Sequence, residues 1–259
     1  MVVKVAVGIW LVACLVTSVS AEINEQKLLD LTYSLDEHTI AWPKNKSFTR
    51  EKTAWGRAAG GYWYASGEFS MSEHAGTHID APLHFAEGMQ SVDEIPIQKL
   101  VGSAIAIDIH VAVDIDPDYR LTRQDILDWE SRYGAIPPGA VVLMYTGWGK
   151  RWPDRERYLG SATPSDAKTL HFSGFSKDAA EFLITERKID GIGIDTPSID
   201  YGPSQDFVVH QVINGANLYG LENLANLEKV PPKGAILVAL PIKIKGGTGG
   251  PVRVLAILP

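Results

Sequence analysis

Short apolar runs rich in β-branched residues recur along the chain, with turn signals between them. They lie at 104–113, 140–145, 189–194, 235–240 and 252–258, and each predicts a strand. Several of these runs lack the polar alternation of a half-exposed strand, which indicates burial on both faces. The pattern therefore predicts a sheet core assembled largely from buried strands.

Two segments between these strands have the spacing of amphipathic helices. Residues 122–125 offer a capping-box-like start for a helix that runs to Tyr133 and stops at Gly134. Ser176 caps a second predicted helix that continues through Arg187. No low-complexity linker interrupts the pattern, so the predicted fold class is α/β, a single domain with a mixed β-sheet core and flanking helices.

Residues 1–21 have the layout of a secretory signal peptide. Lys4 supplies a positive charge, an apolar run extends from Val5 to Val16, and small residues lead to a predicted cleavage after Ala21. An N-terminal membrane anchor is the alternative, but the apolar core is short against the roughly twenty residues that span a bilayer. We therefore expect residues 22–259 to form one secreted domain.

The composition of the mature chain limits which metal ligands and which binding partners are possible. Cleavage removes Cys14, the only cysteine, so any metal site in the mature chain must use histidine and carboxylate ligands. The formal charge is −7, and no basic run is interleaved with aromatic residues, which argues against nucleic acid or an anionic membrane as a partner. Asn45-Lys46-Ser47 is a glycosylation sequon, which in a secreted chain predicts a surface loop.

Candidate metal-ligating side chains are most concentrated in residues 72–85, which hold three histidines and an aspartate together with a glycine and a proline. The four groups are His74, His78, Asp80 and His84. Imidazole nitrogen and carboxylate oxygen are the ligands that zinc and manganese prefer, so the cluster predicts a metal site. The alternative is a polar turn whose histidines are hydrogen-bonded separately. Gly76 and Pro82 disfavour one continuous helix, so we expect a loop that enters a short strand and leaves through a turn.

The pattern His74-x-Gly76-Thr77-His78-x-Asp80-x-Pro82-x-His84 resembles the signature of the metal-dependent cyclase and kynurenine formamidase family, which also contains isatin hydrolases. A second family segment is a histidine followed twelve positions later by a glutamate, and His210 and Glu222 have that spacing. Stretches at 171–176, 193–200 and 243–251 also resemble the family, so the likeness covers the chain from about Leu29 onward.

The resemblance implies roles for individual residues and a mixed-sheet β/β/α architecture of the swivelling type. It implies that His74, His78 and Asp80 bind one divalent metal, and that Asp80 bridges to a second ion held by His210 and Glu222. His84 would be the catalytic acid and base, and Trp42 would line the substrate pocket. The resemblance further implies a small-molecule amide substrate and a homo-oligomer, a dimer or larger.

Each of these roles has an alternative in the sequence itself. His210 follows an apolar run and on its own is typical of a core histidine, and Glu222 is typical of a first-turn helix acid. His84 could be an additional metal ligand instead of a proton carrier. His171 fits a structural role, the loop 246–250 lacks the Lys of a phosphate loop, and the sequence does not separate site-lining from loop-holding roles for Asp195 and Asp200.

The resulting functional prediction is a metal-dependent amidohydrolase. N-formylkynurenine, cleaved to kynurenine and formate, is the first substrate that the resemblance implies, and an isatin-like cyclic amide is the second. A secreted location argues against the first, because tryptophan degradation is usually intracellular. A serine hydrolase is disfavoured because no Gly-x-Ser-x-Gly elbow occurs. A secreted metal- or ligand-binding protein without turnover is the non-enzymatic alternative.

Overall fold

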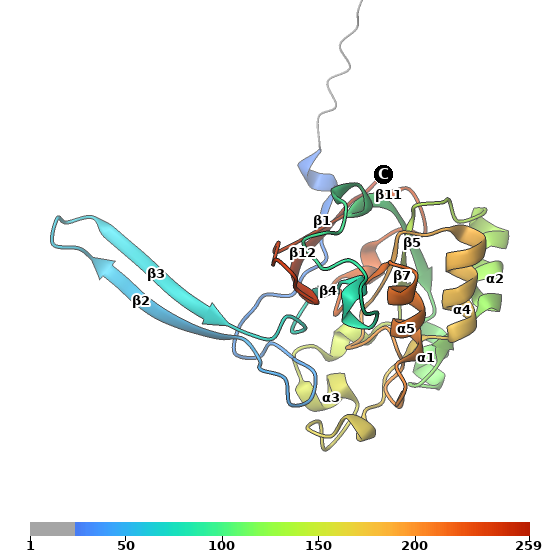
Figure 1. The fold of residues 1–259 in the computed structure, drawn as a ribbon, viewed down its shortest axis with the longest axis horizontal. Helices are drawn as coiled ribbons and strands as arrows, with labels where there is room; N and C mark the ends of the chain where they lie inside the picture. The colour runs from blue at the N-terminus through green and yellow to red at the C-terminus, as the bar shows by residue number, and fades with distance from the viewer. Residues whose placement is uncertain (1–23) are drawn as a thin grey trace, which may run out of the picture.

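The computed structural model describes residues 24–259. The predicted signal peptide and its cleavage point lie outside these residues. One large sheet forms the centre of the described chain, with a few helices beside it (Figure 1). Within residues 24–259, no helix has the length and apolar character needed to cross a lipid bilayer.

An eight-stranded mixed sheet has the order β1-β12-β11-β5-β7-β9-β10-β4, and β4 also pairs with β12. Seven of the strands therefore close into a barrel-like ring, to which β1 adds at β12. The strands of this sheet are β1 (Leu28–Asp30), β4 (His78–Asp80), β5 (Val101–Asp108), β7 (Val141–Tyr145), β9 (Gly191–Ile194), β10 (Tyr219–Glu222), β11 (Ala235–Pro241) and β12 (Gly249–Ile257).

Five α-helices occur among the described residues: α1 (His110–Ile115), α2 (Arg123–Tyr133), α3 (Arg155–Leu159), α4 (Lys177–Phe182) and α5 (Val208–Gly215). Apolar side chains of α2, α4 and α5, among them Ile126, Ala180 and Ile213, pack with sheet residues in one buried cluster. A second cluster, with Ile79 and Leu221, occupies other positions of the ring strands. The prediction of a single domain with a mixed sheet is confirmed. The prediction of flanking helices holds only in part, because the helices are too few and too short to form complete layers on the sheet.

The predicted helix starts are confirmed. Thr122 caps α2 in a complete capping box with Asp125, and Gly134 ends the helix with φ 88°. The Ser176 hydroxyl accepts from the Ala179 amide at the start of α4, and a π-helical turn extends that helix to Arg187.

One strand prediction is too long. The run at 104–113 leaves the sheet after Asp108 and continues as α1, because Asp108 accepts the His110 amide and turns the chain. Short apolar runs do not distinguish a strand from a helical turn, and within α1 only Val113 is buried.

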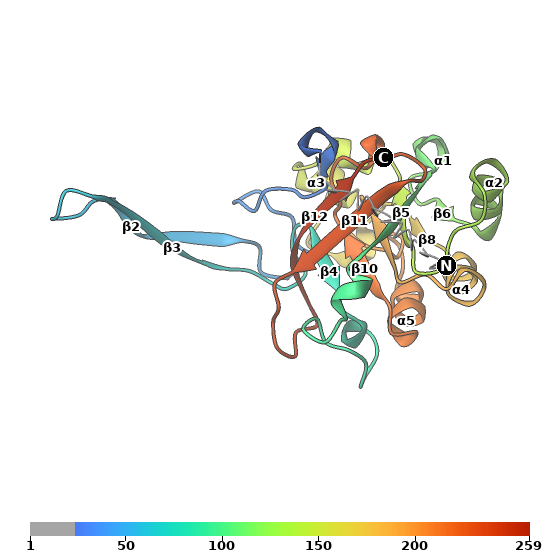
Figure 2. The same ribbon diagram turned by 90° about the horizontal axis from the view of Figure 1, so that it is seen from above.

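A two-stranded arm, β2 (Thr49–Arg57) with β3 (Trp63–Ser70), was not predicted. Figures 1 and 2 both show it standing away from the rest of the molecule. A separate pair, β6 (Arg120–Leu121) with β8 (Gly174–Phe175), is short and parallel.

Candidate metal centre

The short strand β4 places the first cluster where the ring closes. As predicted, a loop enters the strand at His78, and a 3₁₀ turn over Pro82–His84 follows it. β4 pairs with β10 so that Glu222 lies opposite His78, and with β12 so that Gly249 lies opposite Asp80. Pairing across the sheet therefore brings Glu222 to the cluster from a distant part of the sequence.

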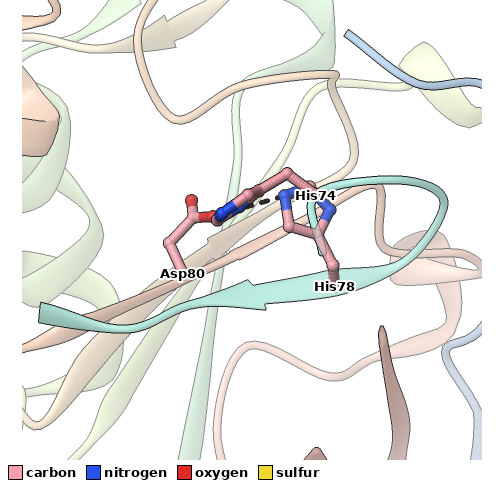
Figure 3. A group of neighbouring side chains, drawn as sticks. All are labelled: His74, His78 and Asp80. Carbon is pink, nitrogen blue, oxygen red and sulfur yellow. Dashed lines mark hydrogen bonds and ion pairs between the residues drawn. The ribbon is translucent and has the colours of Figure 1, made fainter. Parts of the chain in front are cut away.

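The side chains of His74, His78 and Asp80 converge on one point (Figure 3). His74 Nδ1 lies 2.6 Å from Asp80 Oδ1, and His78 Nε2 lies 3.3 Å from the same oxygen. The other carboxylate oxygen, Asp80 Oδ2, lies 3.3 Å from His210 Nε2. Asp80 thus belongs to two groups of donors.

Glu222 joins the two groups. Its Oε2 lies 3.3 Å from His78 Nε2, and its Oε1 lies 3.2 Å from His210 Nε2. His74, His78 and Asp80 form one set of donor atoms close enough to share an ion, and Asp80, His210 and Glu222 form another. The structure thus brings together all five residues that the resemblance implied as ligands.

Hydrogen bonds fix which nitrogen two of the histidines present. His78 Nδ1 lies 2.9 Å from the Gly76 carbonyl, to which it donates, so Nε2 keeps its lone pair toward the carboxylates. His210 Nδ1 lies 2.7 Å from Asp200 Oδ2, which directs its Nε2 toward Asp80. This carboxylate or carbonyl behind each imidazole is the arrangement typical of histidine metal ligands.

Two buried polar atoms in the cluster have no hydrogen-bond partner within residues 24–259: His78 Nε2 and Asp80 Oδ2. Both point into the group of donors. Leaving a buried polar atom unpaired costs about 1–3 kcal/mol, so these atoms fit a bound cation, which both would coordinate.

Charge interactions in the cluster are strong. Burial by itself lowers the pKa of His78, but Asp80 and Glu222 raise this pKa to about 10. Burial opposes ionisation of Asp80, yet His78, His210 and His74 hold its pKa well below the usual range. The buried carboxylates therefore favour positive charge at this place, which a divalent cation supplies once protons leave the imidazoles.

His84 lies beside the cluster and not within either donor set. Its ring stacks on His74 with centroids 3.9 Å apart, and it meets Phe85 edge-on at 4.7 Å. Burial lowers the pKa of His84 to about 4; Asp80 raises this pKa, while His74 and His210 lower it. The imidazole is therefore neutral at pH 7. Its ring makes no hydrogen bond to another side chain or backbone group in the described chain.

The donors open on a cavity of about 200 Å³. Trp42, Phe85 and Phe207 supply its aromatic walls, with Ile40, Leu159 and Pro197 as further apolar lining. Trp42 meets Phe207 at a centroid distance of 5.9 Å, and a bridge between Ala41 and Ala75 ties its loop to the metal-ligand loop. The predicted pocket residue Trp42 therefore lies in the pocket wall, and the exposed Asn45 of the sequon lies at the same pocket.

Several residues support the cluster; the sequence left the role of Asp200 open and gave no role to Thr248 or Gly249. Asp200 accepts from the Val209 and His210 amides as well as from the His210 ring. Thr248 Oγ1 lies 2.9 Å from His74 Nε2 and donates to Glu73. A Cβ on Gly249 would lie 2.6 Å from His74 Cε1, so this glycine permits the close approach of β12.

Two other residues left open in the sequence have structural partners. Asp195 is buried and accepts from Thr146 and Trp148, and within residues 24–259 it forms no hydrogen bond with the five donor residues. His171 is exposed and lies 2.7 Å from Asp118, which agrees with its structural role. The loop 246–250 contributes Thr248 to the site and leads into β12.

The closing strand β4 carries His78 and Asp80, and two sets of histidine and carboxylate donors that share Asp80 meet there, which is the arrangement of a metal-dependent hydrolase. Residues 29–201 match the family model described as a putative cyclase, and the chain belongs to this cyclase family.

Relatives place the chain among hydrolases of this family. It is 37% identical over 207 residues to an isatin hydrolase of Roseibium aggregatum, covering 77% of each chain. It is 30% identical over 230 residues to a kynurenine formamidase of Salinibacter ruber, covering 87% of this chain and 95% of the relative.

Solved structures with a similar fold also include isatin hydrolases. Isatin hydrolase A from Labrenzia aggregata, solved with benzyl benzoate, superposes with a TM-score of 0.81 at 38% identity, over 89% of this chain and 93% of the other. Isatin hydrolase A from Ralstonia solanacearum gives a TM-score of 0.82 at 35% identity, over 90% and 92%.

Proposed function

We propose that this protein hydrolyses the amide bond of a small aromatic substrate, using one or two divalent cations held by His74, His78, Asp80, His210 and Glu222. The observation that carries the proposal is the pair of donor sets that share Asp80 and open on an aromatic-walled cavity. Such a cation lowers the pKa of water from about 15.7 toward 7 and polarises a carbonyl.

Protein side chains bind the substrate, transfer the proton and orient the metal ligands. Trp42, Phe85 and Phe207 present flat apolar faces that hold an aromatic substrate and exclude water from one side of the cavity. His84, neutral and next to the donors, accepts a proton as the nucleophile attacks and returns it to the departing nitrogen. Asp200 and the Gly76 carbonyl keep His210 and His78 in the tautomer that binds a cation.

A cyclic amide of the isatin type is the first substrate to test, and an N-formylated arylamine such as N-formylkynurenine is the second. The greater identity to isatin hydrolase supports this order, which reverses the order that the family resemblance implied. Zinc and manganese both suit the donor set. We further propose that the protein acts in the secretory pathway or outside the cell, as residues 1–21 predict.

Turnover of purified protein distinguishes an enzyme from a binding protein of the same fold. We expect ring opening of isatin, or release of formate from N-formylkynurenine, that a chelator abolishes and that added Mn²⁺ or Zn²⁺ restores. Metal binding without turnover of isatin, N-formylkynurenine or simple aryl formamides would support the non-catalytic binder instead.

A further inference from the structure

The glycosylation sequon of the chain lies at the rim of the cavity that holds the metal-ligand cluster. Asn45-Lys46-Ser47 has the acceptor pattern Asn-x-Ser with a residue other than proline in the middle, and no second Asn-x-Ser or Asn-x-Thr occurs in the sequence. Among the residues of the described chain that line the cavity, Asn45 alone is exposed, and the others are buried or half-buried. Asn45 therefore marks the place where the cavity meets solvent.

A tight turn connects Asn45 to the wall of the cavity. The Asn45 amide donates to the Trp42 carbonyl at 2.9 Å, with Pro43 and Lys44 between them. Lys44 has a φ of 70°, and a proline followed by a residue of positive φ is typical of a type II turn. The two ends of such a turn lie within about 7 Å of each other. A group attached to Asn45 therefore begins beside Trp42.

Hydrogen bonds hold this turn in place from both sides. Before the turn, the Ala41 carbonyl accepts from the Arg155 guanidinium at 3.0 Å, and after it the Ser47 hydroxyl donates to the Thr39 carbonyl. The Asn45 side chain, in contrast, is exposed and forms no hydrogen bond within residues 24–259. The backbone at the rim is thus fixed, while the side-chain amide is free to carry a substituent.

We propose that Asn45 carries an N-linked glycan and that this glycan narrows the entrance of the cavity. Attachment forms a bond between Asn45 Nδ2 and the first carbon of the sugar, as the bond from that carbon to a lipid diphosphate donor breaks and one Nδ2 proton leaves. Glycosylation rests on the leader predicted for residues 1–21. The narrowing also rests on the proposed function, hydrolysis of a small aromatic amide.

The glycan selects substrates by its bulk. Sugars are large and hydrated, so they occupy the solvent at the rim and leave the apolar walls of the cavity as they are. A compact amide such as isatin passes the rim, whereas an amide that carries a further ring clashes with the sugars. Rejecting a competitor by a clash is one of the two ways in which a site becomes specific.

The first test is the mass of peptides from the full-length chain after secretion by animal cells. We expect the wild-type peptide that contains Asn45 to carry a glycan that an N-glycosidase removes. Asn45→Gln and Ser47→Ala should lack it, and Ser47→Thr, which keeps both the sequon and the hydroxyl, is the matched control. Wild-type chain that is not secreted, or that is secreted with Asn45 unmodified, would overturn the proposal.

The second test compares hydrolysis of isatin and N-benzylisatin by the same proteins. The kcat/KM for N-benzylisatin relative to that for isatin should rise on the order of tenfold in Asn45→Gln and Ser47→Ala, and should keep the wild-type value in Ser47→Thr. An unchanged ratio would overturn the narrowing. If neither compound is hydrolysed, the proposed function fails, while the peptide mass still decides glycosylation. Calorimetric affinities for the two compounds then replace the kinetic ratio, and equal affinities in all the proteins, or no binding, would overturn the narrowing.

Discussion

Replacing Asp200 with Asn tests whether the carboxylate behind His210 positions it as a metal ligand. Asp200 Oδ2 accepts from the His210 ring at 2.7 Å and from the His210 amide at 3.1 Å, and Oδ1 accepts from the Val209 amide at 3.0 Å. An amide offers one acceptor oxygen, so in either orientation its NH₂ group faces a donor. If the NH₂ group faces His210, the ring loses the acceptor that fixes its tautomer. If it faces the Val209 amide, two donors oppose each other at the start of α5, which displaces the helix that carries His210.

The expected effect is on metal affinity. Outer hydrogen-bond partners of histidine ligands are worth about 10- to 100-fold in affinity, which corresponds to about 1.4–2.7 kcal/mol. Competition with a chromogenic chelator, using Mn²⁺ and Zn²⁺ in turn, measures this change. Thermal unfolding without metal separates it from a loss of folded protein.

Asp195→Asn is the matched control. Asp195 is also buried and also accepts three hydrogen bonds, but these come from Thr146 and Trp148 and not from a metal ligand. This variant should keep its metal affinity. Equal metal affinity in Asp200→Asn and the wild-type protein would refute the positioning role of Asp200.

Three further predictions follow from the site. His84→Asn should retain metal while kcat falls by about 10²- to 10⁴-fold; loss of metal from the folded variant, measured by elemental analysis, would make His84 a ligand instead. Trp42→Ala should raise KM for an aromatic amide, because it removes the ring that meets Phe207, and steady-state kinetics that leave KM unchanged would remove Trp42 from the pocket wall. Burial raises the pKa of Asp195 to about 6 from 3.8, although hydrogen bonds from Thr146 oppose this. Since the folded state then binds the proton more tightly, wild-type stability relative to Asp195→Asn should fall as pH rises from about 4 to about 6, which urea unfolding at several pH values measures.

The metal cluster shows which parts of a site a sequence reveals. His74, His78, Asp80 and His84 lie within one short stretch, so their donor chemistry is visible without knowledge of the fold. His210 and Glu222 were joined to them only by the family spacing. The physical reason for their proximity, the pairing of β4 with β10, is a long-range contact that local pattern does not encode.

Supporting residues were harder to predict. Asp195 and Asp200 follow the same buried strand and have the same side chain, yet only Asp200 reaches His210. That difference depends on how the chain turns after β9. Thr248 likewise reaches His74 only because β12 closes the ring beside β4.

The arm escaped prediction for a different reason. Sequence patterns for strands rely on burial against a core, and no residue of β2 or β3 is buried. The buried strands of the ring, β7 and β9 among them, were predicted well because their apolar runs reflect burial directly.

Metal content measured together with turnover tests the central claim most directly. We expect the wild-type chain to retain at least one divalent ion after dialysis and to hydrolyse an aromatic amide, Asp80→Ala to lose both metal and turnover, and His84→Asn to lose turnover alone. Asp80 is decisive because it belongs to both donor sets. Hydrolysis by metal-free wild-type protein, or an Asp80→Ala variant that keeps its metal, would contradict the account.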